Sequence, residues 1–339
     1  MTSLATLGRT VALVATCWVL LIVAAPHAMA DAAGPTDYRT DIVSIEPATP
    51  SIELEMIGGD SFMRLEQLEP VEVVIIGYRG EQYLRFDADG TVVENRRSPS
   101  TWLNQDRYDS DVELPSFVDY QAPPQWSVVA EGGAYAWHDH RSHWMSRTRP
   151  PGAEAGDQVL EATVPILVDG ETVTITVASY LLEDPPWWPS ALGVVLSGVL
   201  AAAGLRGGRL PLAVVGVLTS GAALLLGAVA FRSVPPETEP ERLLWLLPLV
   251  GLLAALALVV VRNRLATTVY LDGLSVVTGA TLVAWTITRA DALTRALIPS
   301  DAPASVDRLV IAGAIVAGLV LAGRGLYGLV RPERLIEPT

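Results

Sequence analysis

The pattern of hydrophobic and polar positions divides the chain into two unlike parts. The stretch Asp31–Pro186 alternates apolar and polar residues in short runs, whereas the chain from Pro189 onward is dominated by long apolar segments. Alternation with a period of two is typical of half-buried β-strands, and apolar runs of about 20 residues are typical of membrane-spanning helices. The pattern therefore predicts a β domain followed by a helical membrane domain. It excludes a single soluble enzyme and a disordered chain.

Short strands are expected throughout the polar part. Ile52–Ile57 alternates apolar and acidic side chains, and Val71–Tyr78 is a β-branched run long enough for one central strand. Asp89-Gly90 and Asp169-Gly170 each separate two strand-like runs, which is typical of a tight hairpin. We find no helical periodicity here, and we interpret Arg96–Gln125 as a long irregular loop. Seven or more short strands predict a β-sandwich, immunoglobulin-like in the broad sense.

The first thirty residues have the pattern of a secretory signal peptide. Arg9 precedes an apolar core, Val11–Ala25, and Ala28-Met29-Ala30 forms a small-residue cleavage site. Cleavage would leave Asp31 as the first residue and would remove Cys17, the only cysteine. An uncleaved N-terminal anchor is the alternative. The prediction places Asp31–Pro186 outside the cytoplasm.

The membrane domain, 187–331, is expected to hold five spans. Asp184–Pro189 contains two tryptophans flanked by prolines, which suits the interface between lipid headgroups and water. Export of the β domain places the arginine-rich loops and the tail 332–339 in the cytoplasm, in agreement with the positive-inside rule. Four spans are the alternative count. The five predicted spans are Ser190–Leu205, Leu210–Phe231, Leu243–Val261, Leu265–Trp285 and Leu309–Val330.

Charge separates the two parts further. The net charge is −14, and Asp31–Asp184 alone carries 28 acidic residues against 10 arginines. So acidic a domain repels phosphate backbones, which excludes nucleic acid as a partner. Cations, membrane lipid and other envelope or metal-handling proteins are the partners that this composition favours.

Three of the four histidines lie within six consecutive positions. They are His138, His140 and His143, in the segment Trp137–Met145. On a strand, His138 and His140 would project from the same face, roughly 6.5–7 Å apart along the chain. A turn at Ser142 could then add His143, which would give three imidazoles around one ion.

Imidazole nitrogens suit copper and zinc, and a domain without cysteine offers no thiolate. Met145 is a weak additional ligand if the metal is copper. Asp139 would point to the opposite face of the strand. There it could orient the histidine ligands without binding the metal itself, or pair with Arg141. The alternative is structural: the histidines would pack among the neighbouring aromatic rings and bind only backbone or acids.

Two copper-protein families resemble this layout. The exported, histidine-bearing β domain joined to a membrane bundle resembles the CopC/CopD type of copper-handling proteins. His138-Asp139-His140 resembles the copper-binding H-x-H of the soluble domain of particulate methane monooxygenase, and only His138 and His140 match that motif. The whole-chain arrangement also resembles actinobacterial membrane proteins with an exported β-sandwich, a resemblance that implies an architecture and no activity. The copper resemblances imply copper as the bound metal, with zinc as the alternative.

Two charged residues interrupt the apolar segments. Asp272 and Arg324 are expected at similar depth in the fourth and fifth spans, because these spans run in opposite directions. Charges within a membrane normally pair or line a cavity, so we expect an intramembrane ion pair.

The sequence as a whole favours a membrane-anchored metal-binding protein that senses, stores or delivers copper, and an enzyme is not favoured. The competing hypothesis is a cell-envelope interaction or scaffold protein with a structural histidine cluster. Both hypotheses place the protein in the cell membrane, with the β domain outside and the C-terminus in the cytoplasm.

Overall fold

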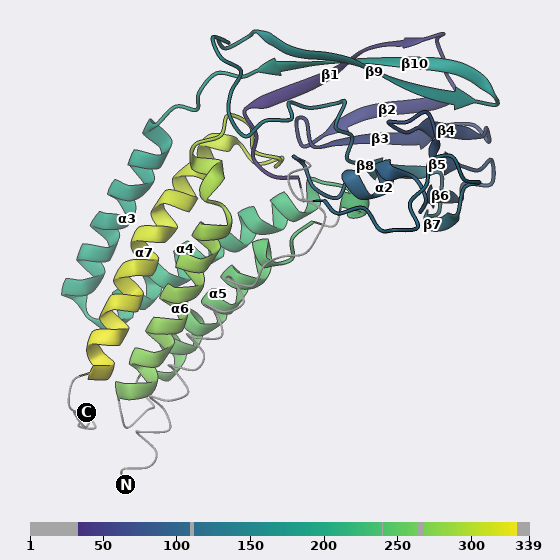
Figure 1. The fold of residues 1–339 in the computed structure, drawn as a ribbon. Helices are drawn as coiled ribbons and strands as arrows, with labels where there is room; N and C mark the ends of the chain where they lie inside the picture. The colour runs from purple at the N-terminus through teal and green to yellow at the C-terminus, as the bar shows by residue number, and fades with distance from the viewer. Residues whose placement is uncertain (1–32, 109–111, 239, 263–267, 331–339) are drawn as a thin grey trace.

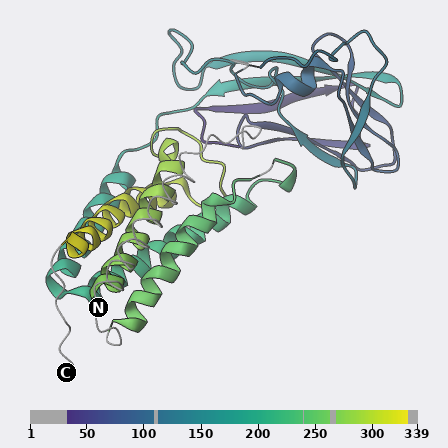
Figure 2. The ribbon, with the colours of Figure 1, turned by 60° about the horizontal axis from the view of Figure 1, so that its bottom comes forward.

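The computed structural model describes residues 33–108, 112–238, 240–262 and 268–330. An antiparallel β domain sits at one end of an elongated bundle of helices, as both ribbon views show (Figures 1 and 2). The predicted fold class is confirmed: a domain of antiparallel sheets precedes five apolar helices that are long enough to span a membrane. The immunoglobulin-like topology stays a prediction. The predicted signal peptide and the cytoplasmic tail lie outside the described residues.

The β domain consists of two sheets. Seven strands form one sheet in the order β1-β10-β9-β4-β5-β6-β7, and three form the other in the order β2-β3-β8. The strands are β1 (Tyr38–Glu46), β2 (Ile52–Ile57), β3 (Phe62–Gln67), β4 (Val73–Ile76), β5 (Gln82–Phe86), β6 (Val92–Asn95), β7 (Trp126–Ala130), β8 (Ala134–Trp137), β9 (Gln158–Val168) and β10 (Glu171–Leu181). All pairings within the two sheets are antiparallel.

The two sheets bury one common apolar core. Met63, Leu65 and Trp137 from the smaller sheet pack with Ile75 and Phe86 from the larger one, and all five are at most 3% exposed. Sheets that pack face to face exclude water from the inward-pointing positions of every strand. This arrangement accounts for the alternation that the sequence shows.

The predicted hairpins are present. Asp169 and Gly170 have positive φ angles of 48° and 82° and join β9 to β10, with Val168 opposite Glu171. Two consecutive positive φ values match the twist of the flanking strands, which is why Asp-Gly is favoured at this point. The Asp89-Gly90 turn joins β5 to β6, with Phe86 opposite Val92, and there only Gly90 has a positive φ, of 88°.

One short helix in the β domain was missed. The helix α2 (Pro99–Leu103) lies within the stretch predicted as an irregular loop. Ser98 caps it by accepting a hydrogen bond from the backbone nitrogen of Ser100, and Pro99 occupies the first turn. Serine followed by proline is a helix-start signal, but five residues are too few to produce a detectable period.

Five long helices follow the β domain. They are α3 (Trp188–Gly207), α4 (Arg209–Arg232), α5 (Leu243–Val261), α6 (Thr268–Thr288) and α7 (Ala304–Val330), with the short 3-10 helices η1 (Pro236–Thr238) and η2 (Ala290–Leu293) in two of the connections. Helix α7 lies between α3 and α6 (Figure 1). It begins five residues before its predicted start, because Asp307 and Arg308 have polar partners that let them enter the helix: Asp307 pairs with Arg289, and Arg308 donates to loop carbonyls.

Small residues bring the helices together, while large apolar residues face outward. Gly193, Ser197 and Ala201 form a buried stripe on α3, but Val195 and Val199 on the same helix are about 60% exposed. A Cβ atom at Gly279 of α6 would collide with the backbone of α7. An apolar exterior with small residues at the contacts is the arrangement expected of helices surrounded by lipid.

A contact that we call the domain seam joins the β domain to the bundle. Thr36 lies just before β1, and Leu297 lies in the loop between α6 and α7. The two residues exchange two backbone hydrogen bonds, of 3.0 and 2.8 Å. The buried Asp37 carboxylate accepts from Arg295 at 2.8 Å and from the Ala296 backbone nitrogen at 3.0 Å. Burial alone would raise the pKa of Asp37, but these hydrogen bonds outweigh it and lower the pKa below the usual 3.8.

Asp272 has two arginine partners instead of one. The predicted partner, Arg324, lies 3.7 Å away, whereas Arg209 contacts both carboxylate oxygens at 3.0 and 3.3 Å. Asp272 is the fifth residue of α6, so the group lies close to the helix end that is remote from the β domain. Arg209 was missed because the sequence pattern placed it in a loop, while it is the first residue of α4.

We predict unequal roles for these two arginines. Arg209→Gln should destabilise the protein by about 1–2 kcal/mol, less than loss of a fully buried partner because Arg324 still faces the carboxylate. Arg324→Gln should cost less, and Arg206→Gln, which removes an exposed arginine at the same end, should cost nothing measurable. Melting temperatures of the purified variants in detergent give the order. A larger loss in Arg324→Gln than in Arg209→Gln would contradict this assignment.

Candidate metal centre

The three clustered histidines lie in a loop, not on a strand. Strand β8 ends at Trp137, and the next residues turn so that the three rings face one another. The expected strand geometry for His138 and His140 is therefore wrong, because Asp139 forms a turn instead of continuing the pleat. The ring centroids are 4.5 Å apart for His138 and His143, and 5.5 and 5.7 Å from His140 to these two.

One ring nitrogen of each histidine contacts a backbone carbonyl. The Nδ1 atom of His138 lies 2.6 Å from the Ser61 oxygen, and the Nδ1 atom of His143 lies 3.1 Å from the Trp144 oxygen. The Nε2 atom of His140 lies 2.8 Å from the Asp106 oxygen. A carbonyl only accepts hydrogen bonds, so each of these nitrogens carries the proton and the opposite nitrogen keeps its lone pair.

The three rings also bring candidate ligand nitrogens together. One ligand atom from each of the three histidines lies within 4.8 Å of the other two. The Nε2 atoms of His138 and His143 are buried and have no hydrogen-bond partner. Ten buried side-chain atoms among the described residues have no partner, and these two differ from the rest in belonging to rings of one cluster, an arrangement compatible with a bound ion.

Burial keeps two of the rings neutral. His138 is 7% exposed and His143 is fully buried. Burial lowers the pKa of His138 to about 4, and burial together with the nearby charges of His138 and Arg107 lowers the pKa of His143 to about 2. A neutral imidazole has the free lone pair that a metal needs, so these ligands require no deprotonation at neutral pH.

Asp139 and Arg141 hold the loop in its turn. The fully buried Asp139 carboxylate accepts from the Arg141 side chain at 2.7 and 2.9 Å and from its backbone nitrogen at 3.0 Å. Arg141 also donates to the Ile76 carbonyl at 3.0 Å. Burial raises the pKa of Asp139, but the Arg141 charge outweighs it and holds the pKa below 3.8. This ion pair fixes the backbone between His138 and His143.

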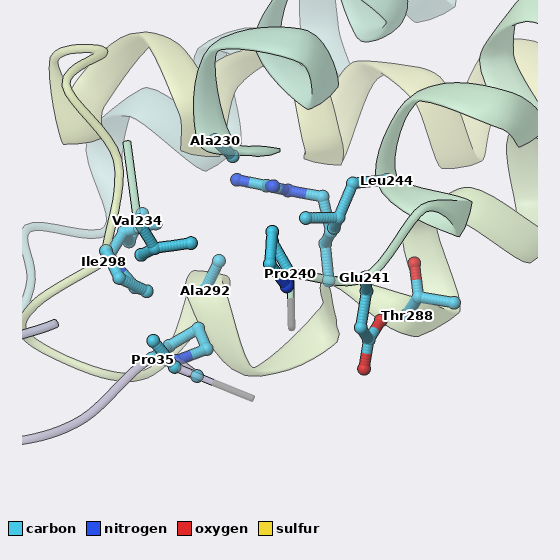
Figure 3. A pocket seen from close by; sticks show the side chains of 13 residues that line it. Pro35, Ala230, Val234, Pro240, Glu241, Leu244, Thr288, Ala292 and Ile298 are labelled. Atoms are coloured by element: carbon cyan, nitrogen blue, oxygen red, sulfur yellow. The ribbon is translucent and has the colours of Figure 1, made fainter. Parts of the chain in front are cut away.

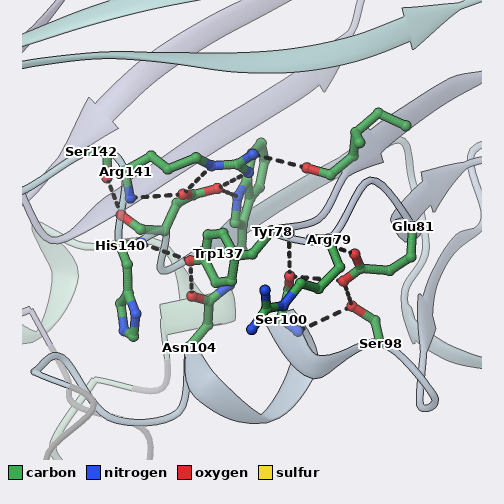
Figure 4. Close-up of polar contacts among 12 residues, drawn as sticks. Tyr78, Arg79, Glu81, Ser98, Ser100, Asn104, Trp137, His140, Arg141 and Ser142 are labelled. Atoms are coloured by element: carbon green, nitrogen blue, oxygen red, sulfur yellow. Dashed lines mark hydrogen bonds and ion pairs between the residues drawn. The ribbon is translucent and has the colours of Figure 1, made fainter. Parts of the chain in front are cut away.

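Tyr78 was missed by sequence reasoning. Its ring stacks on His140 with centroids 5.8 Å apart, and its hydroxyl accepts from the His140 backbone nitrogen at 2.8 Å and donates to Asn104 (Figure 4). The guanidinium of Arg141 lies 5.0 Å from the centre of the same ring. Tyr78 follows β4 and is 62 residues from His140 in the sequence, so no local pattern links the two.

A second missed group lies under His138. Asp60 is fully buried and pairs with Arg107 at 2.6 Å. Both belong to segments that supply carbonyls to the histidines: Ser61 follows Asp60, and Asp106 precedes Arg107. The glycines before Asp60 signalled a turn in the sequence, but nothing in the sequence connected that turn to the histidines.

Met145 is 37% exposed, on the loop that follows the cluster. Its side chain is therefore partly in solvent, whereas the three imidazoles are at least half-buried. The centre that the described residues form is a set of three imidazoles, with no carboxylate among its ligands.

Comparison with known proteins adds no identification: no family model, no curated protein and no solved structure matches this chain. The class of protein therefore follows from the fold and the site. It is a membrane protein with a β domain that carries a three-histidine cluster compatible with metal binding.

We predict that the metal-free protein loses stability in acid through this cluster. The folded-state pKa values of His138 and His143 lie below the usual 6.5, so the unfolded chain binds protons first as the pH falls. The two histidines contribute fully to the free energy of unfolding above pH ~6.5. This contribution is lost as the pH falls from there towards the folded-state pKa of His138, about 4, at about 1–3 kcal/mol per pH unit for the two together.

Melting curves in chelator at pH 7, 6 and 5 test this, with the His138→Gln/His143→Gln double variant as the comparison. The melting temperature of the parent should fall more steeply than that of the variant. Glu94, whose pKa burial raises to about 7, acts in the opposite direction but equally in both proteins. Parallel slopes would show that the rings are not buried as described.

Proposed function

We propose that this protein is a membrane-anchored extracytoplasmic metal-binding protein that senses, stores or delivers copper. The observation that carries the proposal is the arrangement of the three histidines. Each holds its proton against a backbone carbonyl and leaves its other nitrogen for a shared ion. Histidine ligands of metals characteristically donate their second ring N–H to a carbonyl or carboxylate.

The donor set supports copper first and zinc second. Calcium and magnesium prefer oxygen ligands, and the cluster offers only imidazole nitrogen. Among divalent first-row metals, nitrogen sites bind copper more tightly than zinc. Asp60 and Asp139 are each paired with an arginine, so the surroundings add little net charge to the site. The resemblance to CopC/CopD-type proteins points to the same metal.

The scaffold hypothesis remains the alternative. It gains support from the acidic surface of the β domain, which could bind another envelope protein. Under that hypothesis the cluster is structural, and the two unsatisfied Nε2 atoms have no role. The unsatisfied atoms therefore favour the metal.

We predict that the full-length protein in detergent binds one copper ion per chain. The His138→Ala/His143→Ala variant should bind it more than about a hundredfold less tightly, since even changes behind the ligands cost 10- to 100-fold. Met145→Ala is the matched control, and its affinity should stay within about twofold because Met145 is partly in solvent.

Metal analysis and competition with a coloured chelator measure both quantities. Equal affinity of the parent and the double variant would overturn the metal proposal. Partners that co-purify with the protein whether or not chelator is present would then support the scaffold.

The proposed orientation places the β domain outside and the C-terminus in the cytoplasm. Arg206 and Arg209 lie at the end of the bundle remote from the β domain, as the positive-inside rule requires. At the near end Arg295 pairs with Asp37, and Arg289 pairs with Asp307. Arg232 and Arg242 are also at this near end and are exposed, so the proposed orientation rests on the far-end arginines and on the expected export of the β domain.

We predict opposite accessibility for two single cysteines in a chain with Cys17→Ser. Glu131→Cys lies on an exposed turn of the β domain, and Arg206→Cys is exposed at the far end of the bundle. A membrane-impermeant maleimide should label the first in intact cells and the second only after permeabilisation. The reverse pattern would place the β domain in the cytoplasm.

A further inference from the structure

We propose that metal binding at the histidine cluster and closure of the domain seam are coupled, so that the metal tightens the contact between the β domain and the bundle. This inference rests on the proposed function, because it assigns a regulatory consequence to the same site. It follows from the turn between β2 and β3, residues Gly58 to Ser61, which contacts the histidines on one side and the seam on the other.

The first step links the metal site to this turn. The Ser61 carbonyl holds His138 Nδ1 at 2.6 Å, so the ring cannot shift without moving Ser61 or losing that bond. Asp60, the preceding residue, is fully buried and pairs with Arg107 at 2.6 Å. Arg107 in turn follows Asp106, whose carbonyl holds His140. Two of the three ligands are therefore attached to one buried ion pair.

The second step links the turn to the bundle. The backbone at Gly59 lies so close to the seam that a Cβ atom there would stand 3.0 Å from both methyl groups of Leu297 and 3.1 Å from the Thr36 methyl. Thr36 and Leu297 are the two residues that exchange backbone hydrogen bonds across the seam.

A second connection runs in parallel through β1. The Thr40 hydroxyl donates to the Ser142 carbonyl at 2.6 Å, which ties the histidine loop to the strand that begins directly after Asp37. The Thr40 backbone nitrogen donates to the Gly59 carbonyl at 2.9 Å. The histidine loop, the turn and the start of β1 thus form one hydrogen-bonded unit beside the seam.

Metal binding would move the three histidine rings closer together. Imidazole nitrogens bound at about 2.0–2.1 Å to tetrahedral zinc, the alternative metal, lie about 3.3 Å apart. Adjacent ligands in the square-planar geometry of copper lie closer, at about 2.9 Å. The three nitrogens now lie within 4.8 Å of one another, so binding draws them together by up to about 1.5 Å. Because interiors are close-packed, a shift of this size is passed to Ser61 and the turn.

The seam has room to respond on one side. A pocket of about 590 Å³, including its open mouth, lies beside it. Pro35, which directly precedes Thr36, faces Ala292 and Ile298 of the α6–α7 connection across this pocket (Figure 3). Leu297 precedes Ile298, so unfilled space lies beside this segment, although Ile298 itself packs in the core of the bundle.

Coupling must be reciprocal: if metal stabilises the closed seam, a weakened seam must weaken metal binding by the same factor. Arg295→Gln tests this in a residue of the membrane domain whose side chain reaches the β domain through Asp37. Asp37→Asn removes the other side of the pair, together with the 3.3 Å contact of Asp37 with Arg149 within the β domain. Asp41→Asn is the matched control, since it removes one carboxylate from β1 that pairs only with the exposed Arg39 in the described structure.

In full-length protein in detergent, Arg295→Gln and Asp37→Asn should each weaken copper binding at least fivefold, and Asp41→Asn should leave it unchanged. In the parent protein, copper should slow amide hydrogen exchange in the segment containing Ala296 and Leu297, whose backbone nitrogens bond across the seam. The exchange measurement needs no variant and therefore stands even if a seam variant fails to fold.

Unchanged copper affinity in both seam variants, or identical exchange of the Leu297 segment with and without copper, would overturn the coupling while leaving the metal site intact. Absence of copper binding in the parent protein would instead overturn the proposed function and the coupling together. The two failures are thus distinguishable.

Discussion

Three backbone carbonyls define the histidine cluster. Ser61, Asp106 and Trp144 each hold the protonated nitrogen of one imidazole, so the tautomer and the direction of every free lone pair are set before any ion arrives. Preorganisation of this kind reduces the entropy lost on binding. These carbonyls come from three separate segments of the β domain, and the rest of its loops are arranged to hold those segments in place.

Buried ion pairs give the loops this fixed position. Asp139 with Arg141 shapes the turn that carries the histidines, and Asp60 with Arg107 fastens the segments that supply two of the carbonyls. A buried pair contributes little net stability, because the desolvation cost offsets the attraction, but it tolerates few alternative geometries. We interpret the two pairs as devices that specify the geometry of the loops around the site, while the apolar core between the sheets supplies the stability.

The sequence predicted the architecture well because periodicity is a local property. Alternation in Ile52–Ile57 and the Asp169-Gly170 turn each depend on residues that are neighbours in the chain, and the five apolar runs needed only their length and composition. Of the candidate site, the sequence predicted only the histidine cluster, since His138, His140 and His143 are close together along the chain. Tyr78 and Arg107 approach them through tertiary structure, which one sequence does not reveal. The strand geometry of the histidines was wrong for a related reason: Asp139 prefers a turn once a buried arginine is available to its carboxylate.

The position of the site relative to the membrane follows from the same loops. The β2–β3 turn lies between the histidines and Leu297 in space. Asp37, just before β1, accepts a hydrogen bond from the backbone of Ala296 in the α6–α7 loop. A site that only stored an ion could lie anywhere on the β domain. The histidine cluster instead lies near the α6–α7 connection, which also anchors the start of α7 through the bonds of Arg308 to the carbonyls of Ala292 and Ala296. This placement links the bundle to the histidine cluster through packed and hydrogen-bonded residues. Among the three proposed roles, sensing makes use of that connection, because only a sensor requires that occupancy outside the membrane alter the arrangement of the helices within it.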